Sequence, residues 1–171
     1  NAVMFGPAGH AYVYFTYGMH HCMNVTCGRG ARPGDGSGRA AAVLVRALAP
    51  VAGVEVMARR RGMTDRHRLA RGPGSLARAL GLDRRHDGTD LTTGPVWVAD
   101  LPARREGRRV ARGPRVGIRL AAERPWRYWL AGDPHVSRAP GAPEARREPR
   151  RSAAPARRGR SRHRAGGGER R

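Results

Sequence analysis

The chain has 171 residues, enough for one domain with a hydrophobic core, and its formal net charge is +21 at pH 7. All 34 basic side chains are arginine, whose planar guanidinium suits phosphate, so polyanions are the natural partners. A GC-rich genome would also enrich arginine, and charge alone does not establish nucleic-acid binding. No apolar run approaches the roughly 20 residues that span a bilayer and no signal peptide is visible, which predicts a cytoplasmic protein without a membrane partner.

Residues 11–24 predict a β-hairpin. Aromatic and β-branched residues lie on both sides of Gly18, and glycine tolerates the positive φ of a tight turn. Strands are therefore expected near 11–16 and 20–27. Tyr17 would then project from the hairpin tip, where an aromatic ring on a basic protein can enter a duplex and help to extrude a nucleotide.

The rest of the chain up to residue 137 alternates strand and helix patterns. Further strands are expected near 41–47, 95–99, 115–120 and 127–131. Helical spacing of apolar residues predicts one helix over 51–61 and a second that starts at 72–75 and runs to Leu80. The start of the second helix could bind a phosphate through Gly74 and Ser75, although an ordinary helix start is the simpler interpretation.

These elements predict an α+β domain: a mixed or antiparallel curved sheet, a protruding hairpin and a few helices. The Gly-rich connection 28–39 lacks the ending of a phosphate-binding P-loop and is interpreted as a hairpin extension. Residues 138–171 hold twelve arginines and three glutamates without apolar periodicity, which predicts a disordered tail, with electrostatic tethering to DNA as a secondary role. The first residue, Asn1, is not methionine, which favours a fragment or a processed product.

Five residues with polar or thiol side chains stand out within these patterns. Arg46 interrupts an apolar segment, where an unpaired arginine would be costly, so a buried partner, most simply a carboxylate, is expected. His20 and His21 point to opposite faces of a strand and are poor joint metal ligands. Cys22 and Cys27 fit neither a zinc site nor a disulfide framework, and Cys22 is expected to be a buried thiol.

The segment 12–24, Tyr-Val-Tyr-Phe-Thr-Tyr-Gly-Met-His-His-Cys-Met-Asn, resembles the core motif of the alkyladenine (3-methyladenine) DNA glycosylase family, methylpurine-DNA glycosylase type. Further segments similar to the family follow in the family's order: 43–50, 71–76, 114–118, 126–128 and 133–137. The resemblance covers residues 1–137. It implies excision of alkylated or deaminated purines by hydrolysis of the N-glycosidic bond, with no cofactor. The implied partner is damaged double-stranded DNA, bound by a monomer at the nucleoid of a bacterium.

The resemblance also implies roles for the hairpin tip. Tyr17 resembles the wedge that enters the minor groove and fills the gap left by the flipped nucleotide. Met19 and His20 flank this wedge and would contact the surrounding base pairs. Together with Gly74 and Ser75, these residues form the expected DNA-binding set.

Four further residues resemble the family's pocket and water-binding groups. Tyr14 corresponds to one wall of the base pocket, and a cationic alkylated purine over its face would gain ~0.5–2 kcal/mol. Asn24 corresponds to a residue that crowds the amino group of normal guanine. Arg46 resembles the arginine that helps to hold the attacking water, and Val116 resembles a residue whose backbone carbonyl does likewise. On residue type alone, Tyr14 would be core packing, Asn24 a turn or edge residue and Arg46 a surface cation.

The family's general base, a glutamate, lies upstream of this chain's first residue, together with a pocket tyrosine and a pocket histidine. None of the thirteen acidic residues present falls within the strands that hold Tyr14, Asn24 and Arg46. Losing a positioned general base costs ~10²–10⁴-fold in rate, so the chain by itself is expected to be inactive or impaired. The absence of lysine favours a monofunctional, water-using mechanism over a Schiff base.

Three functions remain open from the sequence. The first is a base-excision-repair glycosylase represented by an N-terminally incomplete sequence. The second is a non-catalytic, degenerate module that binds damaged DNA and retains the wedge. The third is a basic RNA-binding or ribosome-associated protein, which explains the charge but not the ordered motifs.

Overall fold

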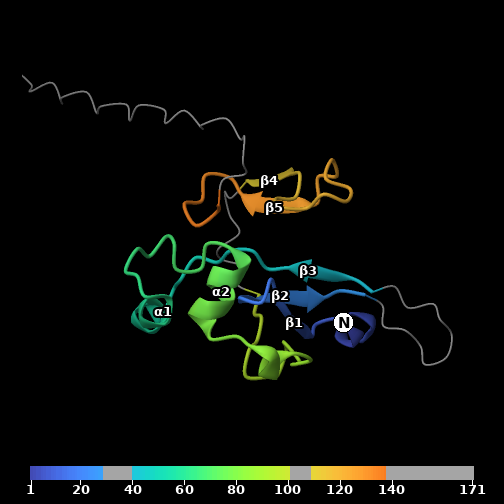
Figure 1. Cartoon of the computed structure of the whole chain (residues 1–171), viewed down its shortest axis with the longest axis horizontal. Helices are drawn as coiled ribbons and strands as arrows, with labels where there is room; N and C mark the ends of the chain where they lie inside the picture. Colours follow the sequence, from blue (N-terminus) through green and yellow to red (C-terminus); the bar gives the residue numbers. More distant parts are fainter. Residues whose placement is uncertain (29–39, 101–108, 138–171) are drawn as a thin grey trace, which may run out of the picture. The chain divides into compact units, whose positions relative to one another are not determined.

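Five strands form two antiparallel sheets in the computed structural model, which describes residues 1–28, 40–100 and 109–137 (Figure 1). The first sheet has the order β1-β2-β3, with β1 at Ala11–Thr16, β2 at His20–Thr26 and β3 at Ala42–Leu44. The second pairs β4, Val110–Gly113, with β5, Arg127–Leu130. The predicted α+β class is confirmed, although the strands divide between two sheets. All described residues belong to one compact unit, Asn1–Pro140.

The predicted hairpin is formed by β1 and β2. Tyr14 pairs with Cys22 and Tyr12 with Asn24 on one face, while Val13 pairs with Met23 on the other. The turn lies at Tyr17 and Gly18, whose φ angles are 52° and 64°; the glycine was expected to adopt positive φ, and the tyrosine does so as well.

The outer edge of β1 is covered by the segment that follows α2. The Val13 N–H donates to Asp87 Oδ1 at 2.9 Å, and Arg84 Nη1 donates to the Val13 carbonyl at 3.0 Å. The Ala11 N–H donates to the carbonyl of Thr89 at 2.8 Å. This segment contains a short 3₁₀ helix, η2 (Arg84–His86), and an N-terminal one, η1 (Ala2–Phe5), precedes β1. Because these bonds satisfy backbone groups of β1, that edge is not free to pair with another chain.

Of the two α-helices, one packs on the hairpin and the other packs on that helix. Helix α1 spans Val54–Arg61 and helix α2 spans Pro73–Leu80, close to both predictions. The first helix starts later than expected because Gly53 is left-handed, with φ 66°, and interrupts the helical conformation before Val54. Helix α2 packs on β2 and buries Leu76, Ala77 and Ala79 in the main core, which also contains Val13 and Met23.

Three predicted strands differ from the structure. Residues 95–99 are irregular, although Val96 packs against the core and the Val98 N–H donates to the Leu91 carbonyl at 2.8 Å. Residues 115–120 contain a turn with Gly117 at φ 75°, and the strand that pairs with β5 lies earlier, at β4. The strand expected over 41–47 ends at Leu44.

The connection 29–39 and the tail 138–171 lie outside the described residues, so their predicted conformations remain predictions. Within the described parts of the chain, no helix combines the length and the apolar character needed to cross a bilayer.

Candidate active site and nucleic-acid interface

The hairpin tip, residues 17–19, presents two large side chains to solvent. Tyr17 is 84% exposed and Met19 is 68% exposed, and the Met19 N–H closes the turn on the Thr16 carbonyl at 3.1 Å. The left-handed conformation of Tyr17 directs the chain around the turn without burying its ring. An exposed aromatic on a short turn has the form of an intercalating wedge.

His20 joins this tip to the first turn of α2. A Cβ placed on Gly74 would lie 2.9 Å from His20 Cγ, so the absence of a side chain at Gly74 permits this close approach. Gly74 lines a groove together with Met19 and His20, whereas Ser75 does not line it. The structure thus brings four of the five predicted DNA-binding residues, Tyr17 among them, to the hairpin tip and its base.

Tyr14 lies on the other side of the hairpin from the core, next to two neighbours. Its ring stacks with that of Tyr12, with centroids 5.3 Å apart and an interplanar angle of 29°. Burial, followed by the adjacent Cys22 thiol, raises the pKa of the Tyr14 hydroxyl, which therefore stays neutral. Burial also raises the pKa of Cys22, a free buried thiol as predicted. A neutral, stacked tyrosine ring is a suitable wall for a planar base.

Asn24 lies on the central strand of the first sheet and is only 8% exposed, so it is neither a turn nor an edge residue. Its Nδ2 donates to the carbonyl of Tyr12 at 3.1 Å. This bond fixes the amide side chain next to the tyrosine pair. Asn24 and Tyr14 therefore share one rigid surface.

Arg46 follows the end of β3 rather than lying inside a strand. Its carbonyl accepts from the Gly72 N–H at 3.0 Å, which ties it to the start of α2. Its Nε is buried without a hydrogen-bond partner, and within the described residues Arg46 forms no ion pair. The carboxylate partner expected from the sequence is thus not present in this part of the chain.

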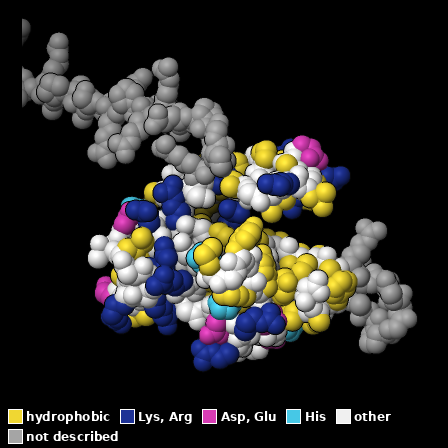
Figure 2. Space-filling view, viewed as in Figure 1, with side chains coloured by type: hydrophobic (Ala, Val, Ile, Leu, Met, Phe, Trp, Pro, Cys, Tyr) yellow, Lys and Arg dark blue, Asp and Glu magenta, His cyan; other side chains and the backbone are white. Residues whose placement is uncertain are grey.

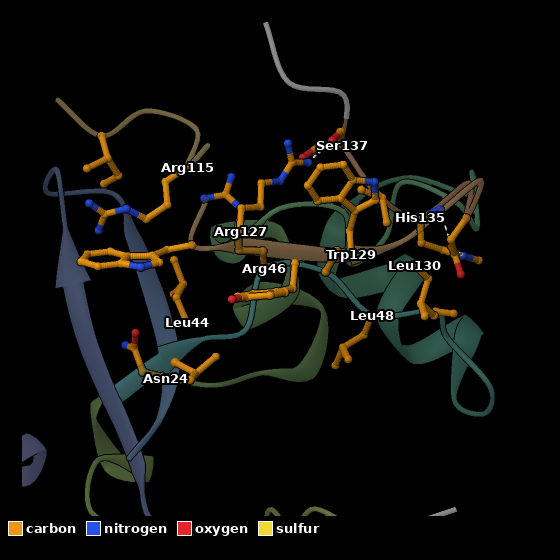
Figure 3. Close-up of a pocket in the computed structure, with 18 of the residues that line it drawn as sticks. Asn24, Leu44, Arg46, Leu48, Arg115, Arg127, Trp129, Leu130, His135 and Ser137 are labelled. Carbon is orange, nitrogen blue, oxygen red and sulfur yellow. Dashed lines mark hydrogen bonds and ion pairs between the residues drawn. The ribbon is translucent and has the colours of Figure 1, made fainter. Parts of the chain in front are cut away.

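A cavity of about 860 Å³ brings Tyr14, Asn24 and Arg46 together with residues of the second sheet. Figure 3 shows Asn24 and His135 toward opposite ends of it, with Arg46 and Arg127 between them. We call this space the arginine cavity. Arg115 and Ile118 also line it, but Val116, in the turn between them, does not.

Arg127 is the main site residue that sequence reasoning missed. It is only 7% exposed, its guanidinium lies 4.8 Å from the centroid of Trp129, and its Nη2 donates to the carbonyl of Ser137. Burial, followed by the charge of Arg46, lowers the pKa of Arg127. The available signal was an arginine in the strand pattern Trp-Arg-Tyr-Trp-Leu, where alternation places it on the same face as Trp129.

An acid–imidazole pair also lines the cavity. Asp133 Oδ1 accepts from the backbone N–H of His135 and lies 2.9 Å from its Nδ1, while the ring of His67 packs 4.9 Å from that of His135. The Nε2 atom of His135 is buried without a hydrogen-bond partner. Asp133 is the acidic residue that lines this cavity among the described residues. No three His, Cys, Asp or Glu side chains in the described ranges gather where they could share a metal ion.

Comparison with known proteins connects these features. Residues 1–134 match the family model described as methylpurine-DNA glycosylase (MPG). A protein from Rhodopseudomonas palustris (strain BisB18) is 48% identical over 138 residues, which cover 81% of this chain and 64% of that relative. A protein from Methanoculleus marisnigri is 47% identical over 81% of this chain and 69% of the relative.

A third relative, from Frankia casuarinae, is 46% identical over 87% of this chain and 70% of its own length. All three bear the name "Putative 3-methyladenine DNA glycosylase". The chain spans about two thirds of the length of these curated relatives. It belongs to the methylpurine-DNA glycosylase family.

Proposed function

We propose that the chain carries the DNA-recognition surface and part of the active site of a base-excision-repair glycosylase. Its substrate is double-stranded DNA that contains an alkylated or deaminated purine, and its reaction is hydrolysis of the N-glycosidic bond. One observation carries this proposal: a single hairpin presents the exposed Tyr17 at its tip and the fixed pair Tyr14 and Asn24 at a cavity. The names of the relatives support the same activity.

The tip acts on the duplex. Tyr17 enters the minor groove and replaces the stacking of the nucleotide that leaves the helix, while Met19 and His20 contact the flanking base pairs. Extrusion costs a few kcal/mol for a paired base and less for a damaged one, so the wedge favours damaged sites.

The cavity receives the extruded base. A 3-methyladenine or 7-methylguanine base is cationic, and the face of Tyr14 attracts it by ~0.5–2 kcal/mol. Asn24 crowds the amino group of normal guanine and so disfavours undamaged guanine. The cationic base is a good leaving group that needs little acid assistance, so the chemical burden falls on placing and deprotonating a water molecule.

Arg46 holds that water, and the general base is a carboxylate from outside the described residues. The resemblance assigns a second water contact to the backbone carbonyl of Val116, which would have to reach the cavity from the neighbouring turn because Val116 does not line it in the structure. The support is electrostatic. Arg46 has a buried, unpartnered Nε and lies close enough to Arg127 for its charge to lower the pKa of that guanidinium. A carboxylate placed between two such cations would relieve both the repulsion and the unsatisfied donor.

The mechanism uses water alone. The chain contains no lysine to form a Schiff base, which favours monofunctional base release without strand cleavage. The reaction needs no metal or organic cofactor. The protein acts as a monomer on the nucleoid, in the cytoplasm of a bacterium.

Single-turnover release of 3-methyladenine from alkylated duplex DNA tests whether the general base lies outside the described residues. With the protein in excess, residues 1–171 should release little above the spontaneous rate, because a missing general base costs ~10²–10⁴-fold. Clear release that Arg46→Ala abolishes, and that Arg112→Ala leaves unchanged, would overturn this location. Arg112 is a matched control because it is an exposed arginine on β4 that does not line the cavity.

Asp133 is the alternative candidate for the general base, because it lines the cavity and its Oδ1 lies 2.9 Å from His135 Nδ1. If release is observed, Asp133→Asn identifies its source. Loss of release in this variant assigns the general base to Asp133, and unchanged release leaves another group of the chain to be found.

A second candidate function is a non-catalytic module that binds damaged DNA. It is favoured by the contrast between a complete tip and a cavity in which Arg46 has no described carboxylate partner. An in-frame coding segment for a Glu-x-Glu-Ala-Tyr-like strand before Asn1 would favour the enzyme. A stop codon at that place would favour the binding module.

A further inference from the structure

A second hollow lies next to the hairpin tip, on the side of the two helices. It has a volume of about 470 Å³. It is lined by Met19, His20 and His21 of the hairpin, by Arg60 of α1, and by Gly74 and Arg78 of α2. We call it the helix groove. Because it begins at the tip, a duplex entered by Tyr17 would extend over it.

Two glycines keep the helix groove open. Gly74 allows His20 to pack against the first turn of α2, as described above. Gly81, left-handed at φ 73°, ends α2, and a Cβ at this position would lie 2.9 Å from Arg60 Cζ. Larger residues at these positions would fill the hollow or displace the guanidinium, so the open shape depends on both.

The two arginines of the groove are anchored by backbone carbonyls. Arg60 Nη1 donates to the carbonyl of Ala79 at 3.1 Å, and Arg78 Nε donates to the carbonyl of Arg60 at 2.7 Å. Each guanidinium carries five N–H donors, so several donors remain on each after these contacts. Among the described residues, neither arginine forms an ion pair. Their orientation is therefore fixed while their charge is uncompensated.

The surroundings of the groove are strongly positive. Among the described residues, Asp83 is the one acidic side chain that lines the groove, and its carboxylate accepts from Arg85 Nη2 at 2.8 Å and Nε at 3.1 Å. Burial, followed by the charges of Arg78 and Arg68, lowers the pKa of Arg61. In Figure 2 arginine side chains gather as a dark blue band between α1 and α2, with a histidine beside it. Mutual repulsion of this kind is relieved by a polyanion.

We propose that the helix groove binds the phosphodiester backbone of the DNA beside the step that Tyr17 enters, with Arg60 and Arg78 as the phosphate ligands. This inference rests on the DNA-binding function proposed above and adds a second, damage-independent contact surface to it. The wedge and the arginine cavity select the damaged nucleotide, whereas the helix groove holds undamaged and damaged duplex alike. The imidazole N–H groups of His20 and His21 supply further donors at the end nearest the tip.

The salt dependence of DNA binding tests this assignment. Each phosphate contact contributes about 1 to the slope of log K against log salt concentration. Arg60→Gln and Arg78→Gln should each reduce the slope by about 1, equally for an intact duplex and for one with an abasic-site mimic. Arg78→Lys keeps the charge and should restore the slope.

Arg59→Gln is the matched control. Arg59 is the neighbouring exposed arginine on α1 and does not line the groove, so its slope should stay close to that of the unchanged chain. Because Arg60 also caps α2, thermal unfolding of each variant is measured alongside, and Arg78→Gln serves as the test that does not touch this cap.

The outcomes separate the two proposals. If the unchanged chain binds the abasic-site duplex more tightly than intact duplex, and both Gln variants keep its slope or match Arg59→Gln, the groove assignment is wrong while the proposed function stands. If the chain binds neither duplex, both proposals fail. A loss confined to the abasic-site duplex would assign these arginines to damage recognition and overturn the backbone role.

Discussion

The hairpin tip and the cavity wall belong to one hairpin but are shaped by different forces. At the tip, Tyr17 makes no side-chain hydrogen bond within the described part of the chain, and its position is set by a left-handed backbone. At the cavity wall, Asn24 is held by the carbonyl of Tyr12, and Tyr14 by ring stacking. Turn geometry therefore defines the part that would touch DNA, and side-chain packing defines the part that would select a base.

The largest effect is expected from a substitution in the hydrophobic core that supports both the hairpin tip and the cavity wall. Leu76 of α2 is fully buried in the core that also contains Val13 and Met23 of the hairpin. Leu76→Ala should lower the free energy of unfolding by about 2–5 kcal/mol, measured by urea denaturation. The change would loosen the tip and the wall together.

Leu120 provides the control for this prediction because it is 86% exposed. Leu120→Ala should leave the free energy of unfolding within about 0.5 kcal/mol of the unchanged chain. A loss below about 1 kcal/mol for Leu76→Ala would mean that the hairpin does not depend on α2.

Tyr17→Ala tests the tip alone. A ring that stacks on a base contributes about 1–3 kcal/mol, so binding to a duplex with an abasic-site mimic should weaken roughly five- to 150-fold. Binding to intact duplex should weaken less, because the wedge has no gap to fill there. Fluorescence anisotropy with both duplexes measures the two losses.

Phe15→Ala is the matched control, since Phe15 is an exposed aromatic on β1 whose ring packs against His21 rather than projecting at the turn. It should retain the preference for the abasic-site duplex. Equal losses on both duplexes for Tyr17→Ala would reject the wedge role.

A smaller effect distinguishes the backbone strain at Tyr17 from the contribution of its ring. A non-glycine residue pays about 1–2 kcal/mol for left-handed φ, and asparagine pays less than most. Tyr17→Asn should therefore be more stable than Tyr17→Ala by a few tenths up to about 1 kcal/mol, although both lose the wedge. Equal unfolding midpoints for the two variants would show that the turn relaxes once the ring is gone.

The sequence predicted the tip better than the cavity because the tip is local. Alternating aromatic residues and Gly18 define the hairpin within a few residues, and the structure confirms both strands and the turn. Helix α2 was equally predictable, because its start at 72–75 and its apolar spacing up to Leu80 are also local features of the sequence.

The arginine cavity depends on residues far apart in the chain and was only partly predictable. The resemblance located Tyr14, Asn24 and Arg46, but Arg127 and Asp133 join them through the pairing of β4 with β5. That pairing was missed because β4 has only four residues, Val-Ala-Arg-Gly, whereas Val116, Ile118 and Leu120 alternate with other residues as in a strand.

The smallest predicted effect concerns η2, whose residues bind the backbone of β1 in the cavity wall. Asp83 caps η2 by accepting from the Arg85 N–H at 3.0 Å, and η2 in turn positions Arg84 and Asp87 on Val13 of β1. The side chain of Arg85, followed by its backbone N–H, holds the pKa of the Asp83 carboxyl well below its usual range. A depressed pKa stabilises the fold above the unfolded value of about 3.9, and this contribution is lost as pH falls toward the folded value.

Asp83→Asn should therefore lower the unfolding temperature at pH 7, and the difference from the unchanged chain should shrink below about pH 4. Because Asp83 pairs with an exposed arginine, the difference at pH 7 should be modest. Glu123→Gln, which removes an exposed acid next to Arg124, should show no such difference. If Asp83→Asn weakened the preference for the abasic-site duplex without changing stability, the carboxylate would act on DNA rather than on the cavity wall, and the division between tip and wall would have to be redrawn.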